Sequence, residues 1–303
     1  MILSQANLNL INKDNVIVPQ ASVFELPEKV LQFGTGVLLR GLPDYFIDKA
    51  NRQGIFNGRV AVVKSTNGPT SEFDEQDNLY TLCIRGIAKG EPVSENIISS
   101  AISRVISANE DWNAILEIAK SKDLQIIVSN TTEVGIQLVN ESIDQNPPLS
   151  FPAKVLAVLH ERYKALGAKN TGLVIIATEL IPDNGKKLGS IVVELARFNN
   201  LESDFILWLQ NENKFCNSLV DRIVPGKPDA TSLAKLQAEL GYEDNLLSMS
   251  EPYSLWAIEG DQTVADVLEF AKVDEGVVIA EDIEIYRELK VRLLNGTHTL
   301  TSG

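Results

Sequence analysis

The chain has 303 residues, with 27 Lys and Arg against 41 Asp and Glu, which gives a formal net charge of −14. A chain with a pI near 4.7 is a poor partner for nucleic acid or an anionic membrane surface, since both need clustered Lys and Arg. Hydrophobic residues make up 44%, which is enough for a sizeable core, and no apolar run approaches the ~18 residues of a membrane span. We therefore expect a globular protein with no nucleic-acid or membrane partner.

The cysteines and the N-terminus indicate a reducing compartment. Cys83 and Cys216 are too few for a disulfide framework or a zinc site. The first residues, MILSQ, lack the basic region and long apolar stretch of a signal peptide. We expect a cytoplasmic protein without a metal centre.

Short apolar runs alternate with helical patterns along the first part of the chain. The runs that predict buried strands are residues 29–33 (KVLQF), 59–64 (RVAVVK), 124–129 (LQIIVS) and 172–177 (GLVIIA). Helical patterns cover 37–52, with Pro43 as an irregularity, then 110–121, 151–166, 188–198 and 203–210. Residues 79–85 and 96–106 are strand-rich. Near-continuous Val/Ile/Leu strands separated by helices indicate an α/β fold with a doubly wound, mostly parallel sheet covered on both faces.

The residue composition of the sequence changes after Pro225. Residues 226–231 are rich in Gly, Pro and polar side chains, which is typical of a boundary. We expect one domain over 1–225 and the beginning of a second over 226–303, with strands at 253–259 and 276–280 and a helix at 282–298. No finished element follows that helix, so we expect the second domain to be truncated.

Gly34-Thr35-Gly36 follows the first strand and opens a helix, which is the context of a dinucleotide fingerprint. The glycines permit a tight turn, and backbone N–H groups at the helix N-terminus can then approach a pyrophosphate. Leu39 stands at the third glycine position, so a simple strand-to-helix turn is the alternative. Arg40 is either a further charge near the phosphates or an exposed helix arginine.

The end of the second strand carries Lys64, followed by Ser65-Thr66-Asn67, where an acidic residue is usual. An acidic side chain there binds the ribose 2′-hydroxyl of NAD, and a basic one tolerates the 2′-phosphate of NADP. The residues alone leave the choice between NAD and NADP open.

Three chemically capable side chains crowd the C-terminal stretch: Lys290, Asn295 and His298. On a continuous helix, Asn295 and His298 lie about 60° apart and Lys290 and His298 about 80° apart. They can therefore line one side of a helix that faces a cleft. A lysine can give or take the proton of an alcohol, an asparagine amide can stabilise a developing alkoxide, and a histidine can hold a substrate oxygen. The alternative is a solvated lysine and a polar histidine without a reaction to serve.

Residues 290–298 (KVRLLNGTH) resemble the K-x4-N-x2-H signature of the mannitol dehydrogenase family, the polyol-specific long-chain dehydrogenases. Four further segments resemble the same family in the right order: 32–36 (QFGTG) with Arg40, 129–133 (SNTTE), 179–185 (ELIPDNG) and 215–223 (FCNSLVDRI). The sequences of the segments 129–133 and 179–185 are most similar to those of family members that reduce a keto sugar acid. A fructuronate reductase, a dehydrogenase of a neutral polyol such as mannitol, and a non-catalytic dinucleotide sensor remain alternatives.

The resemblance implies a Rossmann-type domain followed by a mainly helical domain, with catalysis at their interface and NAD as cofactor. It implies that Lys290 is the general acid and base, that Asn295 and Asn184 hold the reacting oxygen, and that His298 binds substrate oxygens. It places Gly34, Gly36 and Arg40 along the pyrophosphate, and Asn130, Thr131 and Glu133 near the nicotinamide ribose. Glu133 and Glu179 have the alternative of merely capping the next helix. We expect NADH in preference to NADPH, with Ser65 or Thr66 serving the ribose and Lys64 pointing away.

Overall fold

The structure is a computed structural model, and it describes residues 1–132 and 134–290. Its largest element is a six-stranded sheet with the order β5-β2-β1-β6-β7-β8. The strands are β1 (Glu28–Phe33), β2 (Arg59–Lys64), β5 (Ile102–Ser107), β6 (Ile126–Ser129), β7 (Val174–Ala177) and β8 (Lys214–Cys216). Every neighbouring pair is parallel. The strand order reverses between β1 and β6, so the predicted doubly wound α/β fold is confirmed.

The side chains of these strands alternate between two cores, one on each face of the sheet. Leu31 and Phe33 point into the first core, and Val30 points into the second. The first face is covered by α4 (Trp112–Ala119), α5 (Phe151–Leu166), α6 (Asn184–Phe198) and α7 (Ser203–Asn211). The second face is covered by α1 (Val37–Gly41), α2 (Pro43–Arg52), α9 (Gln262–Val267) and the 3₁₀ helix η3 (Glu269–Val273).

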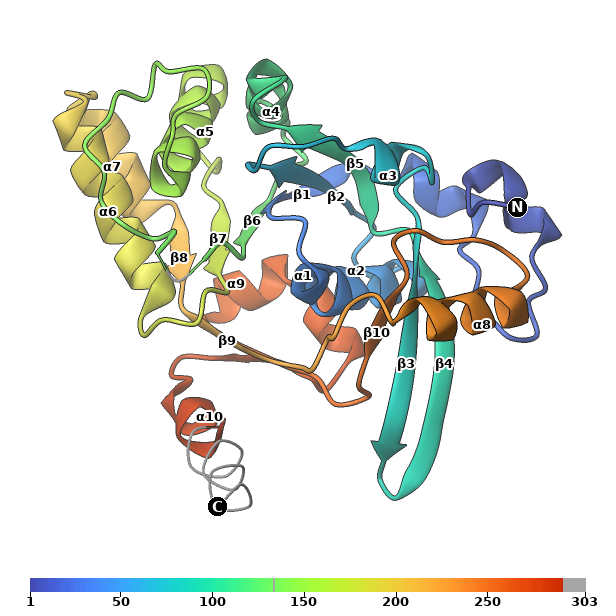
Figure 1. Cartoon of the computed structure of the whole chain (residues 1–303). Coiled ribbons are helices and arrows are strands. Elements are labelled where there is room, and N and C mark those ends of the chain that lie inside the picture. Colours follow the sequence, from blue (N-terminus) through green and yellow to red (C-terminus); the bar gives the residue numbers. More distant parts are fainter. Residues whose placement is uncertain (133, 291–303) are drawn as a thin grey trace.

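Two smaller sheets flank the large one. The strands β3 (Tyr80–Ala88) and β4 (Glu91–Ser99) form a long hairpin that projects from the body of the molecule (Figure 1), and β10 (Ser248–Ser250) runs parallel to β3. The other sheet joins β9 (Ser218–Asp221), β11 (Leu255–Glu259) and β12 (Val277–Ala280). Because β9 pairs with β11 and β3 pairs with β10, segments on both sides of residue 225 share sheets. The division into domains at that residue stays a prediction.

The remaining elements are short or lie at the edges of the fold. They are η1 (Gln5–Leu10), η2 (Ala21–Glu25), α3 (Ser71–Asp74), α8 (Ala230–Leu240) and α10 (Glu284–Leu289). None of the helices in the described parts of the chain is long and apolar enough to cross a membrane.

The predicted irregularity at Pro43 is confirmed. The helix expected over 37–52 is divided at Leu42 (φ −132°, ψ −79°) into α1 and α2, and Pro43 is the first residue of α2. Proline suits that position because the N–H that it lacks would have no partner there. Of the helix expected over 282–298, the structure describes α10, and residues 291–298 lie outside the described residues.

Candidate functional site

The glycine turn lies where the strand order of the large sheet reverses. Gly34 has φ +130°, and a Cβ atom on it would lie 3.0 Å from both Asn130 O and Leu39 Cδ1. A side chain is therefore strained there on two grounds, backbone conformation and space. Gly36 precedes the first turn of α1, and no described atom beyond its two chain neighbours lies within 4 Å of the place its Cβ would occupy. The turn is thus tight on the side of β6 and open at Gly36, in the crevice where doubly wound sheets bind ligands.

The ends of β6 and β7 are joined by a network of side-chain hydrogen bonds. Asn130 Nδ2 donates to Thr178 Oγ1 at 2.9 Å, and that hydroxyl donates to Ser129 O at 2.6 Å. The buried carboxylate of Glu179 accepts from Thr131 N at 2.8 Å, from Thr131 Oγ1 at 2.9 Å and from Ser129 Oγ at 3.1 Å. Glu179 therefore holds the loop after β6 and does not cap a helix.

Asn184 opens α6, and its side chain is fully engaged with the backbone. Its Nδ2 donates to Glu179 O and to Ser218 O, both at 2.9 Å, while its Oδ1 accepts from Gly185 N and Ser218 N, also at 2.9 Å. The amide is 1% exposed. In this structure Asn184 bridges β7, α6 and β9, and its expected role as a ligand of the reacting oxygen stays a prediction.

Lys290 follows α10 and contacts the same strand, β9. Its Nζ donates to Val220 O at 2.7 Å and lies 3.7 Å from Asp221 Oδ1. Asn184 and Lys290 are thus both bonded to β9, and their partners, Ser218 and Val220, are two residues apart along that strand. Asn295, His298 and Glu133 lie outside the described residues, so the predicted Lys-Asn-His set is represented by its lysine.

Arg40 is turned into the protein interior. It is 8% exposed, its Nη1 donates to Leu246 O at 2.6 Å, and its guanidinium packs over the rings of Phe73 and Tyr80. The alternative interpretation of Arg40 as an exposed helix arginine is therefore wrong. The expected position of Arg40 along a pyrophosphate stays a prediction. At the end of β2, Lys64 Nζ donates to Pro69 O at 2.8 Å, so this ammonium is engaged with its own loop.

Several residues of the site are missing from the sequence-based prediction. Gln32 and Asp44 are both fully buried, and Gln32 Nε2 lies 3.3 Å from Gly34 O. The sequence signals that could have identified them are a polar side chain, Gln32, inside the apolar run KVLQF, and a carboxylate, Asp44, on the apolar side of a helix. Thr178 carries no signal in the sequence, and Ser218 lies in the family segment 215–223 without a predicted role, because the importance of both comes from partners on other strands.

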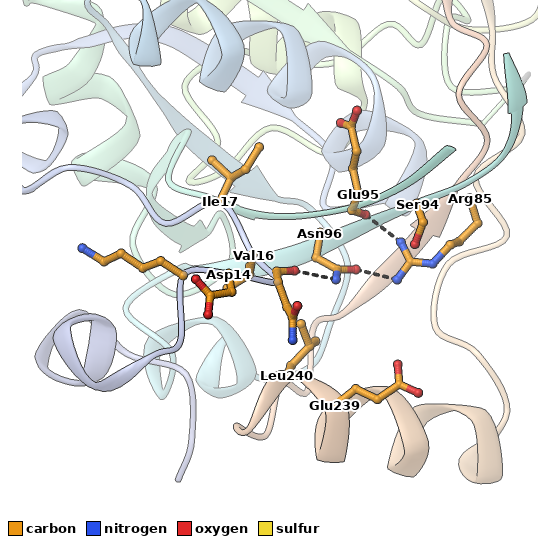
Figure 2. A pocket seen from close by; sticks show the side chains of 11 residues that line it. Asp14, Val16, Ile17, Arg85, Ser94, Glu95, Asn96, Glu239 and Leu240 are labelled. Carbon is orange, nitrogen blue, oxygen red and sulfur yellow. Dashed lines mark hydrogen bonds between the residues drawn. The ribbon is translucent and has the colours of Figure 1, made fainter. Parts of the chain in front are cut away.

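A separate cavity of about 510 Å³ lies between the N-terminal segment, the β3–β4 hairpin and α8 (Figure 2). Arg85 on its wall donates to Glu95 O at 2.7 Å and to Asn96 Oδ1 at 2.6 Å, and Asn96 Nδ2 donates to Asn15 O at 2.8 Å. The cavity contains none of the residues predicted for the site. Within residues 1–132 and 134–290, no cluster of three or more His, Cys, Asp and Glu is arranged to hold a metal ion.

A parallel sheet of this strand order, with a glycine turn at its reversal, defines a Rossmann-type dinucleotide-binding domain. Residues 28–272 match the family model of the mannitol dehydrogenase Rossmann domain. The chain belongs to this family, and the resemblance seen in the sequence is confirmed. The match extends beyond residue 225, into the part of the chain that carries β10 and β11.

The chain is also similar to curated proteins named altronate oxidoreductase. It is 43% identical over 295 residues to that of Halalkalibacterium halodurans, covering 96% of this chain and 57% of the relative. It is 44% identical over 278 residues to that of Bacillus subtilis, covering 91% of this chain and 58% of the relative. The chain thus spans less than three fifths of the length of these relatives.

Two solved structures share the fold. One is a Pseudomonas fluorescens mannitol 2-dehydrogenase in a ternary complex with NAD and D-mannitol, with a TM-score of 0.81 and 21% identity. The other is a D-sorbitol dehydrogenase in substrate-free form, with a TM-score of 0.81 and 20% identity. Both similarities cover 98% of this chain and 62% of the other.

Proposed function

We propose that the carboxyl edge of the large sheet binds NAD(H), and that the chain is the cofactor-binding part of an oxidoreductase that interconverts tagaturonate and altronate. The observation that carries the proposal is the turn at Gly34, which closes against Asn130 at the reversal of the sheet and is open at Gly36. The curated relatives named altronate oxidoreductase, at 40–44% identity, favour this pair of sugar acids.

The residues present fit a dinucleotide. A turn without a side chain at Gly34, where a Cβ would be strained, and with open space at Gly36 lets a pyrophosphate approach the backbone closely. Asn130 and Thr131, held by Thr178 and Glu179, form a fixed wall on the side of β6 where the nicotinamide ribose would lie. Glu133 belongs to the same proposed set of cofactor-binding residues. When bound, NADH supplies the hydride that adds to the keto carbon of the sugar acid.

The proton that completes the reduction comes from Lys290. As the hydride adds to carbon, negative charge develops on the former carbonyl oxygen, and the Nζ ammonium gives that oxygen one proton, leaving a neutral amine and a secondary alcohol. In the oxidation the amine takes the proton back. The contacts of Nζ with Val220 O and Asp221 hold it in position while leaving N–H groups for the substrate. Asn295, His298 and Asn184 complete the proposed set as ligands of the substrate oxygens.

A substrate panel on the full-length protein tests the proposal. Initial rates with tagaturonate, fructuronate and fructose, each with NADH, should show the highest kcat/KM for tagaturonate. A preference for fructuronate or fructose would instead support the reductase or polyol dehydrogenase alternatives.

A variant pair tests the role of Lys290. Lys290→Ala should lower kcat by ~10²-fold or more, the usual scale of general acid–base help. The exposed Lys235 on α8 is the matched control, and Lys235→Ala should leave kcat unchanged. Unchanged turnover of Lys290→Ala would overturn the assignment, and NADH binding without any turnover in the wild-type protein would favour the non-catalytic sensor.

A further inference from the structure

A glutamine and an aspartate are paired in the interior, directly beneath the glycine turn. Gln32 in β1 and Asp44 in α2 are both 0% exposed. The Gln32 Nε2 atom lies 3.3 Å from Gly34 O and 3.4 Å from Asp44 Oδ2, and it donates to both. One buried side chain therefore links the first carbonyl of the turn to a carboxyl group in the core.

Two oxygens of this same pair have no partner. Gln32 Oε1 and Asp44 Oδ1 are buried, and neither has a hydrogen bond to any described atom. The orientation of the amide is fixed by Gly34 O, which can only accept, so the nitrogen faces that carbonyl and Oε1 is an acceptor. A carboxamide and a carboxylic acid can form two antiparallel hydrogen bonds. The two unpartnered oxygens are the atoms that the second of these bonds would join if Asp44 carried a proton.

The next carboxylate on the same helix shows what Asp44 lacks. Asp48 is also buried, but it accepts from Ser100 N at 2.9 Å, from Ser100 Oγ at 3.2 Å and from Arg52 Nε at 2.8 Å. These partners stabilise its charged form, and they oppose the burial that raises its pKa. Asp44 has only the long bond from Gln32, and an uncompensated carboxylate in the interior is costly.

Among the described residues, none of the other charged or titratable groups around Asp44 donates a hydrogen bond to its carboxyl group. Arg40 from α1 directs Nη1 to Leu246 O, and Tyr80 from β3 donates its hydroxyl to Arg40 O at 2.9 Å. Burial raises the pKa of Asp44 to about 7, with the charge of Asp48 adding to the effect and the charge of Arg40 and the Gln32 bond opposing it. The carboxyl group is thus neutral below neutral pH.

We propose that Asp44 is a positioning residue for the cofactor turn, and that its neutral carboxyl donates to Gln32 Oε1 and so keeps Gln32 Nε2 on Gly34 O. This inference rests on the proposed binding of NAD(H) at the turn. Loss of the proton sets a carboxylate oxygen against an amide oxygen, which drives the amide away from Gly34 and loosens the turn. The affinity for NADH therefore falls as the pH rises through neutrality.

The test is the pH dependence of NADH binding by the full-length protein, followed by the change in NADH fluorescence. We expect the wild-type Kd to be about tenfold weaker at pH 8.5 than at pH 6, the size of shift that a two-state element of this kind supports. Asp44→Asn offers an N–H to Gln32 Oε1 and an oxygen to Gln32 Nε2 at every pH, so its Kd should stay constant over this range. Asp48→Asn is the matched control: it should keep the loss of NADH affinity with rising pH, with the midpoint moved to lower pH because one charge that raises the pKa of Asp44 is removed. A flat wild-type profile, or a tenfold dependence that persists in Asp44→Asn, would overturn the proposal.

A second measurement needs no cofactor, so it separates this inference from the proposed function. Because the pKa of Asp44 is higher in the folded chain than in the unfolded chain, the folded state holds the proton more tightly, and stability falls as the pH rises from about 4 to about 7. Asp44→Asn removes this loss. Its melting temperature should therefore exceed that of wild type at pH 8, and the difference should shrink at pH 4.5. If NADH fails to bind while this melting pattern holds, the proposed function is wrong and the neutral Asp44 stands. Equal differences at both pH values would show that Asp44 is not neutral in the folded protein.

Discussion

Glu179 accepts two hydrogen bonds from Thr131, one from the backbone nitrogen at 2.8 Å and one from Oγ1 at 2.9 Å. These bonds tie the loop after β6 to the end of β7, on the side of the switch point opposite to the glycine turn. The proposed nicotinamide side of the site is therefore held by a buried carboxylate on the neighbouring strand. A loop that is fixed before the ligand arrives loses less conformational freedom on binding.

Removing this carboxylate should weaken both the fold and the site. We expect Glu179→Ala to lower the free energy of unfolding by about 2–3 kcal/mol, because hydrogen bonds to charged groups contribute about 1.5–3 kcal/mol and Ser129 loses its acceptor too. The Kd for NADH should weaken by about tenfold as the loop relaxes. Glu179→Gln keeps one acceptor oxygen and should be intermediate. Urea unfolding and NADH titration measure the two effects, and wild-type values for Glu179→Ala in both would contradict the assigned role.

The sequence predicted the parts of the fold that have a hydrophobic period. Buried strands such as KVLQF and RVAVVK are apolar on both faces, and Pro43 marks the break between α1 and α2. The β3–β4 hairpin was only partly predicted. Residues 86–95 extend into solvent and are mostly exposed, and their mixture of glycine, proline, charged and apolar residues has no apolar alternation to read. Strands of three residues, such as β8 and β10, are too short to show a period at all.

The site was predicted where a motif is local and missed where it depends on distant partners. Gly34 and Gly36 stand at the end of β1 as predicted, since a glycine turn between a strand and a helix is a contiguous signal. Arg40 contacts Leu246, which is 206 residues away, and the amide of Asn184 bonds to Ser218, which is 34 residues away. A motif within one short segment cannot predict contacts between residues that lie so far apart in the sequence. The direction of these side chains follows from the tertiary fold alone.

The contact of Lys64 with its own loop predicts the choice of cofactor. Lys64 Nζ donates to Pro69 O, which directs this side chain towards its own loop, and we expect it to lie away from a 2′-phosphate. The enzyme should prefer NADH to NADPH by about tenfold or more in kcat/KM, a difference of about 1.4 kcal/mol. Lys64→Met should keep this preference, and the exposed Lys122 provides a matched control as Lys122→Met. A selective loss of NADPH activity in Lys64→Met would show instead that Lys64 contacts the phosphate.

The two cysteines should be inert towards thiol reagents in the native protein. Burial raises the pKa of Cys83 to about 11 and that of Cys216 to about 12, so each thiol loses its proton only far above neutral pH. Because the thiolate is the reactive form, alkylation at pH 8 should be at least about 100-fold slower than for a free thiol of pKa ~8.5. Mass spectrometry after iodoacetamide treatment should find no modification in the folded chain and two modified sites in guanidinium chloride. Rapid labelling of either cysteine in the folded chain would contradict the burial that underlies this prediction.

The four backbone contacts of Asn184 predict that substitution there acts first on stability. Asn184→Ala leaves Glu179 O, Gly185 N and both backbone groups of Ser218 without the partner that they have in the native structure. Buried groups left in this way cost about 1–3 kcal/mol each when no water replaces the partner, and we expect a total loss of about 3–4 kcal/mol in the free energy of unfolding.

Asn184→Asp gives a sharper comparison, because it keeps the shape and the acceptor oxygen of the side chain. It replaces the two donated hydrogens with a carboxylate oxygen that faces two carbonyl oxygens, so it should be at least as unstable as Asn184→Ala above the pKa of an ordinary carboxyl group. Urea unfolding of the two variants measures this effect, and kcat at saturating NADH measures any separate role at the substrate. If Asn184 serves only to hold the reacting oxygen, both variants will lose turnover while unfolding at the wild-type urea concentration. That outcome would require the amide to leave its bonds to β9 when the substrate binds.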